Sequence, residues 1–466
     1  MVSDRRGALL IGLLVWLSCA WFGSWEWNPN NSTRLFAAIS LVENGDATID
    51  EFAALTIDKA RFGDHFYLDK APGMTLMALP AVWIADRVSG DDAHRHRLFL
   101  DDDATARFLR LRLRLAAASG PALLTGIAAA LLYDLALALT GGAGAALAAS
   151  LCFALGTPIW GWSTTIFGHA AVAALFVMAA CGIWRTTPRG ALVAGAALGW
   201  AVVVEYQSAL TGAALGLWAL ARWWRTPGRW RLIGGAGAAG CAALVPLVAY
   251  NEVAVGVALR FGYSGVVGFE GMNQGLFGLG TPNLLVLNEL LFGGYRGLLW
   301  LSPAMLAAAF GLRLLVRAPA TRGIGWACIG TVAACFLVNA SYIYWDGGNS
   351  TGPRLAMPMA GLLALGLAPL WRASAARQRW LVTGAALLSG AINLVVASAD
   401  IMAPPPWRFP LYQVVWRQRF VAGDLRTWPS EWLGWSPWAG LALWAAVALP
   451  SLALLARRAG RLSAGA

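Results

Sequence analysis

Lysine is scarce in this sequence, and so are charged residues in general. Only two lysines, Lys59 and Lys70, stand among the 35 basic residues. Charged residues make up 13% of the 466 positions, whereas a soluble domain carries roughly 25%. Because hydrophobic residues make up 58%, the composition excludes an ordinary soluble globular protein.

The net charge of +11 does not indicate a nucleic-acid-binding protein. The arginines stand in groups between apolar runs rather than along one polar stretch. That distribution is the positive-inside pattern, which orients membrane helices. We therefore expect the cations to set topology, and we expect no nucleic acid partner.

Patterned cysteine and histidine sites are also lacking. The six cysteines all lie inside apolar runs, without a CxxC pair or a Cys/His ligand spacing, so we expect small core residues. Asp101-Asp102-Asp103 and the pair His94 and His96 have neither a strand–turn–helix pattern nor a third ligand around them, so we predict no metal site there. No Walker A sequence, GxGxxG fingerprint or serine elbow occurs in a fitting context.

Apolar runs, in contrast, recur along most of the chain. They are about 16–22 residues long, enough or nearly enough to cross a bilayer about 30 Å thick. They predict an all-α polytopic membrane protein, a single domain over residues 1–466 with about 11 to 13 transmembrane helices. The runs cover about 7–27, 73–88, 113–138, 142–157, 166–184, 190–205, 208–221, 232–250, 294–316, 323–343, 355–371, 380–399 and 436–456.

The charges between these runs predict the topology. A short charged segment precedes the first run, which lacks a small-residue cleavage site, so we expect an uncleaved first helix with a cytoplasmic N-terminus. The charged stretch 89–112 is then expected in the cytoplasm. External loops are expected at 28–72, 251–293, 342–354 and 400–434.

The region 113–184 raises a problem of parity. Arg114 and Arg185 both favour the cytoplasmic side, but three apolar runs lie between them. The glycine-rich stretch 141–144 indicates that one of these helices is short, broken or re-entrant.

The first external loop concentrates acids and cations in its second half. Both lysines lie there, in two copies of Asp-Lys-Ala eleven residues apart, Asp58-Lys59-Ala60 and Asp69-Lys70-Ala71. A lysine ammonium suits a phosphate oxygen, and a carboxylate can abstract a proton. We therefore predict a site with Asp58 and Asp69 as catalytic residues and both lysines as substrate ligands. A solvated loop with local ion pairs is the alternative.

Further candidates stand where external loops meet the spans. Segment 342–354 holds Asp346, three glycines that let the backbone approach a ligand, and Arg354, which can pair a phosphate with two hydrogen bonds. A turn with an interfacial arginine is the alternative. Glu205 could equally be the partner of an arginine, and His169 a structural histidine. The remaining candidates are Tyr263 and Arg296.

Several segments carry a resemblance to a known family. They are Asn31-Ser32-Thr33-Arg34, Leu41-Val42-Glu43-Asn44-Gly45, Thr56-Ile57-Asp58-Lys59-Ala60, Tyr67-Leu68-Asp69-Lys70-Ala71-Pro72-Gly73, Phe167-Gly168-His169, Glu205-Tyr206, Tyr250-Asn251, Tyr295-Arg296-Gly297, Trp345-Asp346-Gly347-Gly348 and Gly352-Pro353-Arg354. In this order, over about residues 28–370, they resemble the bacterial membrane glycosyltransferases of the GT-C superfamily. Relatives in that superfamily include protein O-mannosyltransferase-like enzymes and the lipid A aminoarabinose transferase.

The resemblance implies a GT-C-like helical bundle with a polyprenyl-phosphate sugar as donor. It implies that Lys70 contacts the donor phosphate and that an acid of the first external loop acts as base or binds the acceptor. Where the aminoarabinose transferases carry two acids soon after the first span, this sequence has Asn30 and Asn31. An amide cannot take a proton, so Asp58 and Asp69 become the leading candidates for the base. Asn31 and Arg34 are retained as candidate substrate ligands.

Together these features predict a glycosyltransferase in the bacterial inner membrane with its active site on the periplasmic side. Its partners would be a polyprenyl-phosphate-linked sugar, a lipid, glycan or protein acceptor, and the bilayer. The mechanism requires no cofactor, and assistance by a divalent metal stays open. One alternative is a transporter or flippase of lipid-linked sugars, which would need ionisable residues near mid-span and paired repeats. The other is a non-catalytic membrane assembly subunit, which the two asparagines would suit.

Overall fold

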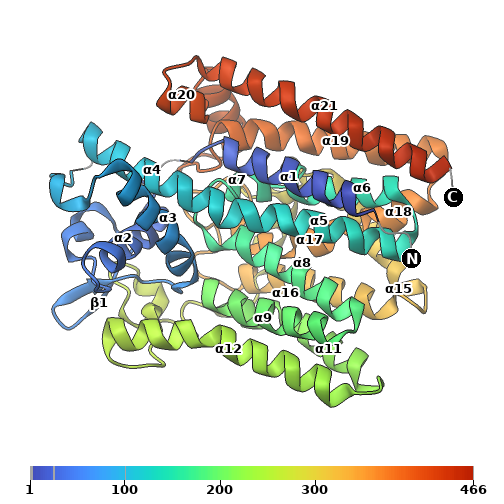
Figure 1. The fold of residues 1–466 in the computed structure, drawn as a ribbon, viewed down its shortest axis with the longest axis horizontal. Helices are drawn as coiled ribbons and strands as arrows, with labels where there is room; N and C mark the ends of the chain where they lie inside the picture. The colour runs from blue at the N-terminus through green and yellow to red at the C-terminus, as the bar shows by residue number, and fades with distance from the viewer. Residues whose placement is uncertain (1–3, 25–26, 100, 465–466) are drawn as a thin grey trace.

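The computed structural model describes residues 4–24, 27–99 and 101–464. Figure 1 shows a long helical bundle with both chain ends at one end, which we call the terminal end. The opposite end, which we call the loop end, carries α2, α3, β1 and the start of α4.

Helices account for nearly all the regular structure. The α-helices are α1 Arg5–Trp21, α2 Pro29–Glu43, α3 Gly73–Ser89, α4 Asp103–Ser119, α5 Pro121–Thr140, α6 Ala143–Leu155, α7 Ile159–Trp162, α8 Gly168–Arg185, α9 Pro188–Val204, α10 Ser208–Thr211, α11 Ala213–Trp224, α12 Arg229–Val255, α13 Leu284–Phe292, α14 Leu298–Leu301, α15 Ala304–Arg317, α16 Arg322–Ala340, α17 Ala360–Ala364, α18 Leu367–Ala373, α19 Ala376–Ser398, α20 Trp428–Trp432 and α21 Pro437–Ala464. Short 3-10 turns are η1 Asp50–Leu55, η2 Ala93–Arg95, η3 Gly262–Gly265, η4 Glu270–Asn273 and η5 Arg354–Met359, and η6 Leu411–Phe420 is a π-helix.

The predicted multi-span helical architecture is confirmed. Within the described residues, seven helical segments are long and apolar enough to cross a membrane: Asp103–Thr140, Gly168–Arg185, Arg229–Val255, Arg322–Ala340, Arg354–Ala373, Ala376–Ser398 and Pro437–Leu462. The apolar helices α6 and α9 are shorter, with 13 and 17 residues. The number of about 11 to 13 crossings stays a prediction, because it depends on whether such shorter helices also cross.

The stretch 89–112 lies at the loop end, opposite the chain termini, so the prediction that it shares one side of the membrane with the N-terminus is wrong. It packs on the first external segment: Glu43 accepts a hydrogen bond from the Ala93 backbone at 2.9 Å, and His94 contacts Asn44 at 3.1 Å. Helix α3, predicted as a span, lies beside α2 at the same end (Figure 1). Its apolar residues are divided between buried contacts and an exposed face with Trp83.

This placement removes the parity problem. Helices α4 and α5 form one run of 38 residues, Asp103–Thr140, from the loop end to the terminal end (Figure 1). Gly141, with a φ of 66°, ends α5, and α6 is the short helix that the glycine-rich stretch predicted. Arg114, taken as a cytoplasmic signal, is instead buried at the loop end and paired with Glu431 at 2.8 Å.

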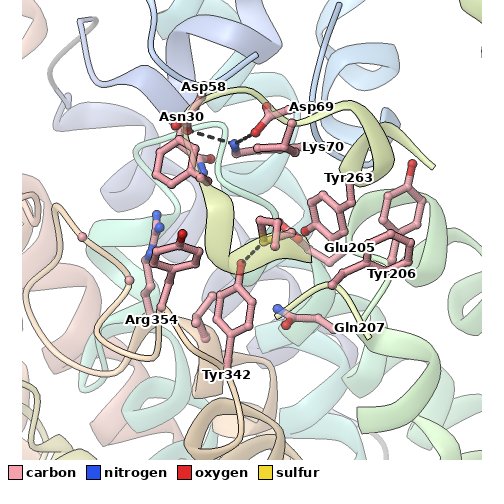
Figure 2. Close-up of a pocket in the computed structure, with 18 of the residues that line it drawn as sticks. Asn30, Asp58, Asp69, Lys70, Glu205, Tyr206, Gln207, Tyr263, Tyr342 and Arg354 are labelled. Carbon is pink, nitrogen blue, oxygen red and sulfur yellow. Dashed lines mark hydrogen bonds and ion pairs between the residues drawn. The ribbon is translucent and has the colours of Figure 1, made fainter. Parts of the chain in front are cut away.

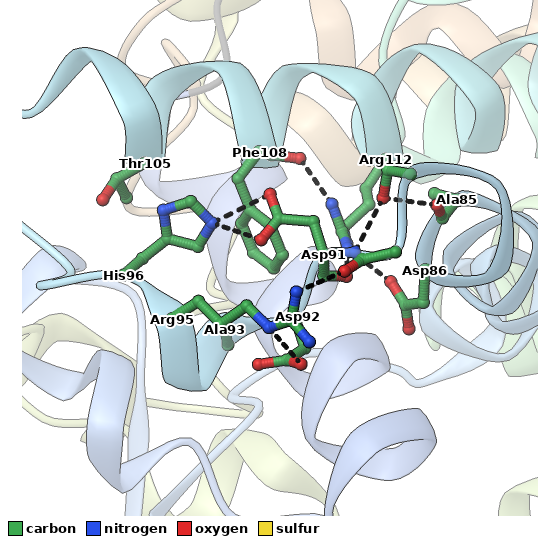
Figure 3. A network of polar contacts seen from close by, with 12 residues as sticks. Ala85, Asp86, Asp91, Asp92, Ala93, Arg95, His96, Thr105, Phe108 and Arg112 are labelled. Carbon is green, nitrogen blue, oxygen red and sulfur yellow. Dashed lines mark hydrogen bonds and ion pairs between the residues drawn. The ribbon is translucent and has the colours of Figure 1, made fainter.

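A network around Arg112 fixes α3 against α4 (Figure 3). The Arg112 guanidinium donates to Asp86 at 2.5 Å and to the Asp91 carbonyl at 2.7 Å, and it lies 3.5 Å from the centre of the Phe108 ring. His96 packs on the other side of this network, 3.0 Å from both oxygens of Asp91. Since α3 follows directly on the candidate site residues of the first loop, this network holds the base of that loop in place.

We expect Arg112→Ala to destabilise the protein by about 2 kcal/mol. Removing one partner of a buried ion pair costs roughly 3–5 kcal/mol, and the partial exposure of Asp86 reduces that figure. Thermal unfolding in detergent micelles measures the effect. Arg95→Ala is the control, because Arg95 is 65% exposed in its pair with Asp92 and should contribute under about 1 kcal/mol. Equal losses in the two variants would contradict this account.

Candidate active site

A cavity of about 760 Å³, which we call the central cavity, opens at the loop end of the bundle (Figure 2). It is bounded by the first loop, the junction of α9 with α10, the segment 261–279 and the segment 342–355. Most of the predicted site residues line it: Arg34, Asp58, Asp69, Lys70, His169, Glu205, Tyr263, Asp346 and Arg354. The fold therefore brings together residues from five separate parts of the sequence, since His169 adds the start of α8.

A β-hairpin explains the spacing of the two Asp-Lys-Ala segments. Strands β1 Ala60–Phe62 and β2 His65–Tyr67 pair antiparallel, with Ala60 opposite Tyr67. The residues just before β1 and just after β2 consequently lie side by side. Asp58 comes from the first side, and Asp69 and Lys70 come from the second.

Lys70 bridges two carboxylates in this arrangement. Its Nζ lies 2.8 Å from Asp58 Oδ2 and 2.6 Å from Asp69 Oδ2 (Figure 2). All three side chains are largely buried, with exposures of 12% for Lys70, 14% for Asp58 and 5% for Asp69. An ammonium group has three donors, so Lys70 keeps one for a ligand in the cavity.

Burial raises the pKa of the Asp69 carboxyl, and the neighbouring Lys70 ammonium only partly opposes this shift. Asp69 Oδ1 is buried and makes no hydrogen bond within the described residues. Such an oxygen is costly to leave without a partner. The acid thus keeps one oxygen for a proton or for a donor from a ligand.

Arg34 and Glu205 form a second, fully buried pair. Arg34 Nη2 donates to Glu205 Oε1 at 2.9 Å, and the same guanidinium donates to the side chain of Asn30. Gly168, at the start of α8, makes room for this carboxylate, because a Cβ there would overlap it. Of the two roles that the sequence left open for Glu205, the structure shows the partner of an arginine.

Arg354 is different, because its charge has no partner. Within the described residues its side chain makes no hydrogen bond or ion pair, and its Nε is buried. The guanidinium lies 4.9 Å from the centre of the Phe167 ring and faces the cavity across from Asp58 (Figure 2). The turn at Gly347, with a φ of 71°, passes so close that a Cβ would overlap Arg354. A half-buried cation that makes no ion pair within the described residues is suited to binding an anion.

Three predicted ligands do not line the central cavity. Lys59 donates to the Ala53 carbonyl and lies 4.9 Å from the centre of the Phe66 ring, because neighbouring residues of an extended chain point to opposite sides. Asn31 accepts a hydrogen bond from the Ile166 backbone at 3.1 Å. Their predicted contact with a ligand in this cavity is corrected accordingly.

Arg296 is the third of these residues. It is fully buried and donates to the carbonyl groups of Asp346, Gly348 and Ser350 at 2.6, 2.7 and 2.6 Å. Its guanidinium is therefore engaged in hydrogen bonds with the backbone of the loop that carries Asp346. Arg296 supports this wall of the cavity rather than contacting a ligand in it.

An aromatic wall is the part of the site that sequence reasoning largely missed. Tyr206 packs edge-on against Phe261 and Tyr263, with ring centres 4.8 and 5.3 Å apart, and Phe277 packs against Tyr263 at 5.9 Å. Tyr342 completes the wall below them (Figure 2). Burial raises the pKa of the Tyr263 hydroxyl, which therefore stays neutral. The sequence predicted Tyr263 as a site residue, but no pattern in it indicated that Tyr263 would form one surface with Phe261, Phe277 and Tyr342.

Comparison with known proteins identifies the fold. No family profile and no curated protein sequence matches the chain. Among solved structures, ArnT from Cupriavidus metallidurans bound to undecaprenyl phosphate is similar over 97% of this chain and 74% of its own, with a TM-score of 0.54 and 16% identity. The chain shares the fold of ArnT.

A second GT-C protein is more distant. The archaeal oligosaccharyltransferase AglB from Archaeoglobus fulgidus, in complex with an inhibitory peptide and a dolichol-phosphate, has a TM-score of 0.45 and 13% identity. The match covers 86% of this chain and 56% of the AglB chain, so this chain spans little more than half the length of AglB. In this chain, the central cavity combines an arginine without a partner in the described residues, a lysine held between two acids, and an aromatic wall.

Proposed function

We propose that this protein transfers a sugar from a polyprenyl-phosphate-sugar donor to an acceptor hydroxyl in the central cavity. The observation that carries the proposal is Arg354, a cation without a partner that faces two carboxylates across the cavity. A transferase of this kind needs a group that holds a leaving phosphate and a base that activates the acceptor. ArnT, which has the same fold, binds undecaprenyl phosphate in its crystal structure.

The donor phosphate would lie between Arg354 and the third donor of Lys70. The polyprenyl chain would follow the apolar side of the cavity past Phe277 toward Leu210 and Leu276, which line it and are 50% and 61% exposed. Exposed apolar residues at a cavity mouth suit an entry from the bilayer. Tyr263 would pack against the donor sugar.

Asp58 or Asp69 would take the proton of the acceptor hydroxyl. The acceptor oxygen then bonds to the anomeric carbon while the bond from that carbon to the phosphate oxygen breaks. The polyprenyl phosphate leaves with the negative charge, which Arg354 and Lys70 stabilise. Attack from the side opposite the phosphate gives an inverting transfer. We propose that this chemistry uses no cofactor and that a divalent metal would at most assist it.

The arrangement of charge supports a periplasmic site. Arginine-rich connections such as 222–231 and 372–379 lie where α11 meets α12 and α18 meets α19, at the terminal end (Figure 1). By the positive-inside rule that end faces the cytoplasm, and the central cavity opens on the outer face of the inner membrane. The ionisable cavity residues gather at one end of the bundle, which disfavours a transporter with a mid-span site.

Polyprenyl phosphate release from polyprenyl-phosphate sugars tests the proposal. We expect Lys70→Met to reduce release by about 10²-fold, because it removes a donor to the leaving phosphate. Lys59→Met is the matched control, since Lys59 points away from the cavity, and it should stay within about threefold of the parent. The proposal is wrong if the parent releases no polyprenyl phosphate from any donor, or if both variants release it equally.

A further inference from the structure

A second cavity lies next to the central one. It has a volume of about 610 Å³ and is more open to solvent, and we call it the aromatic cavity. Its lining includes Glu289, Tyr295, Trp345, Pro405, Trp407 and Arg408. Volumes of roughly 300–1,000 Å³ are typical of small-molecule sites.

The two cavities share a wall. Asp346 lines the central cavity and Trp345 the aromatic one, although they are neighbours in the chain. The Tyr295 hydroxyl, from the aromatic side, donates to Asp346 Oδ2 at 3.0 Å, and Pro405 touches both cavities. A ligand in the aromatic cavity therefore lies one residue away from the proposed transfer site.

The chemistry of the lining matches a sugar. Tyr295 and Trp345 pack edge-on with ring centres 6.1 Å apart, and Trp407 also lines the cavity. Aromatic faces suit the apolar C–H face of a sugar ring, while a carboxylate and a guanidinium suit its hydroxyl edge. Glu289 is fixed at the rim, because its Oε1 accepts the backbone N–H of Tyr295 at 3.0 Å.

One lining segment of the cavity is restricted by its sequence. Trp407 follows three consecutive prolines, 404–406, whose fixed φ angles hold the chain before any ligand binds. Preorganisation of this kind lowers the entropic cost of binding. A peptide ligand would favour an open strand edge, whereas the two described strands, β1 and β2, lie in the first loop.

We infer that the aromatic cavity binds the acceptor and that the acceptor is a glycan, either free or anchored to a lipid. The role of the bound glycan as acceptor rests on the proposed function. The binding of a sugar in this cavity does not depend on catalysis and can be tested by itself. A sugar ring held between Trp345 and Trp407 would direct one hydroxyl past Asp346 into the central cavity.

Direct binding to the full-length protein in nanodiscs tests the inference. The probes are neutral di- and trisaccharides of glucose, mannose, galactose and N-acetylglucosamine, a lipid-linked disaccharide in the nanodisc, and a Ser/Thr-rich peptide, followed by saturation-transfer NMR. We expect at least one sugar probe to bind and Trp407→Ala to weaken it about tenfold, the effect of about 1.4 kcal/mol. Trp407→Phe, which keeps an aromatic face, should retain most of the affinity.

Two controls separate this inference from folding defects and from the proposed function. Trp230→Ala changes a Trp that is 64% exposed on α12, far from the cavity, and should bind sugars like the parent. Polyprenyl phosphate binding should be the same in parent and Trp407→Ala. Loss of that binding would count against separate sites, whereas a parent that binds no polyprenyl phosphate but does bind sugar would overturn only the proposed function.

The result that overturns the inference is equally direct. No sugar binding by the parent at about 10 mM, ten times a millimolar dissociation constant, excludes a useful glycan site. Sugar binding that Trp407→Ala and Arg408→Ala both leave unchanged places the glycan elsewhere. Binding of the peptide probe alone would assign the cavity to a protein acceptor.

Discussion

Arg354→Gln should reduce polyprenyl phosphate release by about 10²–10³-fold, because removal of one group that stabilises a leaving anion has an effect of this size. The same variant should bind polyprenyl phosphate itself more weakly, since the cation contacts the phosphate in both donor and product. Glutamine keeps part of the side-chain length and a polar amide, so the change removes mainly the charge that lies over the Phe167 ring. Equilibrium binding of polyprenyl phosphate and single-turnover release measure the two effects separately.

Two further variants sharpen this test. Arg354→Lys keeps the charge but loses the planar fork, and an intermediate loss of about tenfold is expected. Arg377→Gln removes an exposed arginine at the opposite end of the bundle and should behave like the parent. If Arg354→Gln binds polyprenyl phosphate as tightly as Arg377→Gln does, Arg354 is not the phosphate ligand.

The expected effect depends on a feature that sequence alone could not supply. The sequence predicted Arg34, Arg296 and Arg354 as substrate ligands, and only Arg354 was expected to pair a phosphate with two hydrogen bonds. Folding separates them by their partners: Arg34 is paired with Glu205, and Arg296 is spent on backbone carbonyls. Arg354, in contrast, has no ion-pair partner in the described part of the chain, and this difference appears only in the folded structure.

The two lysines illustrate the same limit. Their identical Asp-Lys-Ala settings predicted a shared site, and the hairpin between them explains why one of them reaches it. Lys70 follows β2 and faces Asp58, whereas Lys59 immediately precedes β1 and faces Phe66. A spacing of eleven residues indicates proximity, but the direction of each side chain depends on strand register.

The predicted side of the stretch 89–112 is wrong because its arginines were counted as free charges, although the fold pairs some of them with acids. Arg112 and Arg114 look like cytoplasmic anchors, but Asp86 and Glu431 neutralise them at the loop end. The positive-inside rule applies to charges that stay in water beside the membrane. The helical class was predictable from apolar run length alone, because it needs no knowledge of pairing.

Replacing the base should have the other large effect. We expect Asp58→Asn to reduce transfer by at least about 10²-fold, the usual effect of removing a general base. Asp58 is the more exposed of the two acids, and it faces Arg354 across the cavity, where an acceptor would meet the donor (Figure 2). Polyprenyl phosphate binding should not weaken, because the variant removes a negative charge near the phosphate.

Asp69→Asn is the matched comparison and should cost only about tenfold. In the parent, the raised pKa of Asp69 means that it takes up a proton at a pH above the ordinary value of 3.8 and then releases its hold on Lys70. Activity should therefore fall as the pH drops through this raised pKa. Asparagine has no proton to gain, so the acidic limb of the pH–rate profile should move to lower pH in this variant.

The relative effects of the two variants decide which acid is the base. If Asp69→Asn loses much of the transfer activity and Asp58→Asn loses little, Asp69 is the base and Asp58 is not. The reacting groups would still be the two acids and Lys70. If both variants lose less than about threefold of the transfer activity, neither acid is a general base, because a general base contributes at least about 10²-fold. In that case the Lys70 bridge would serve to hold the hairpin, and Arg354 would remain as the only argument for phosphate chemistry in this cavity.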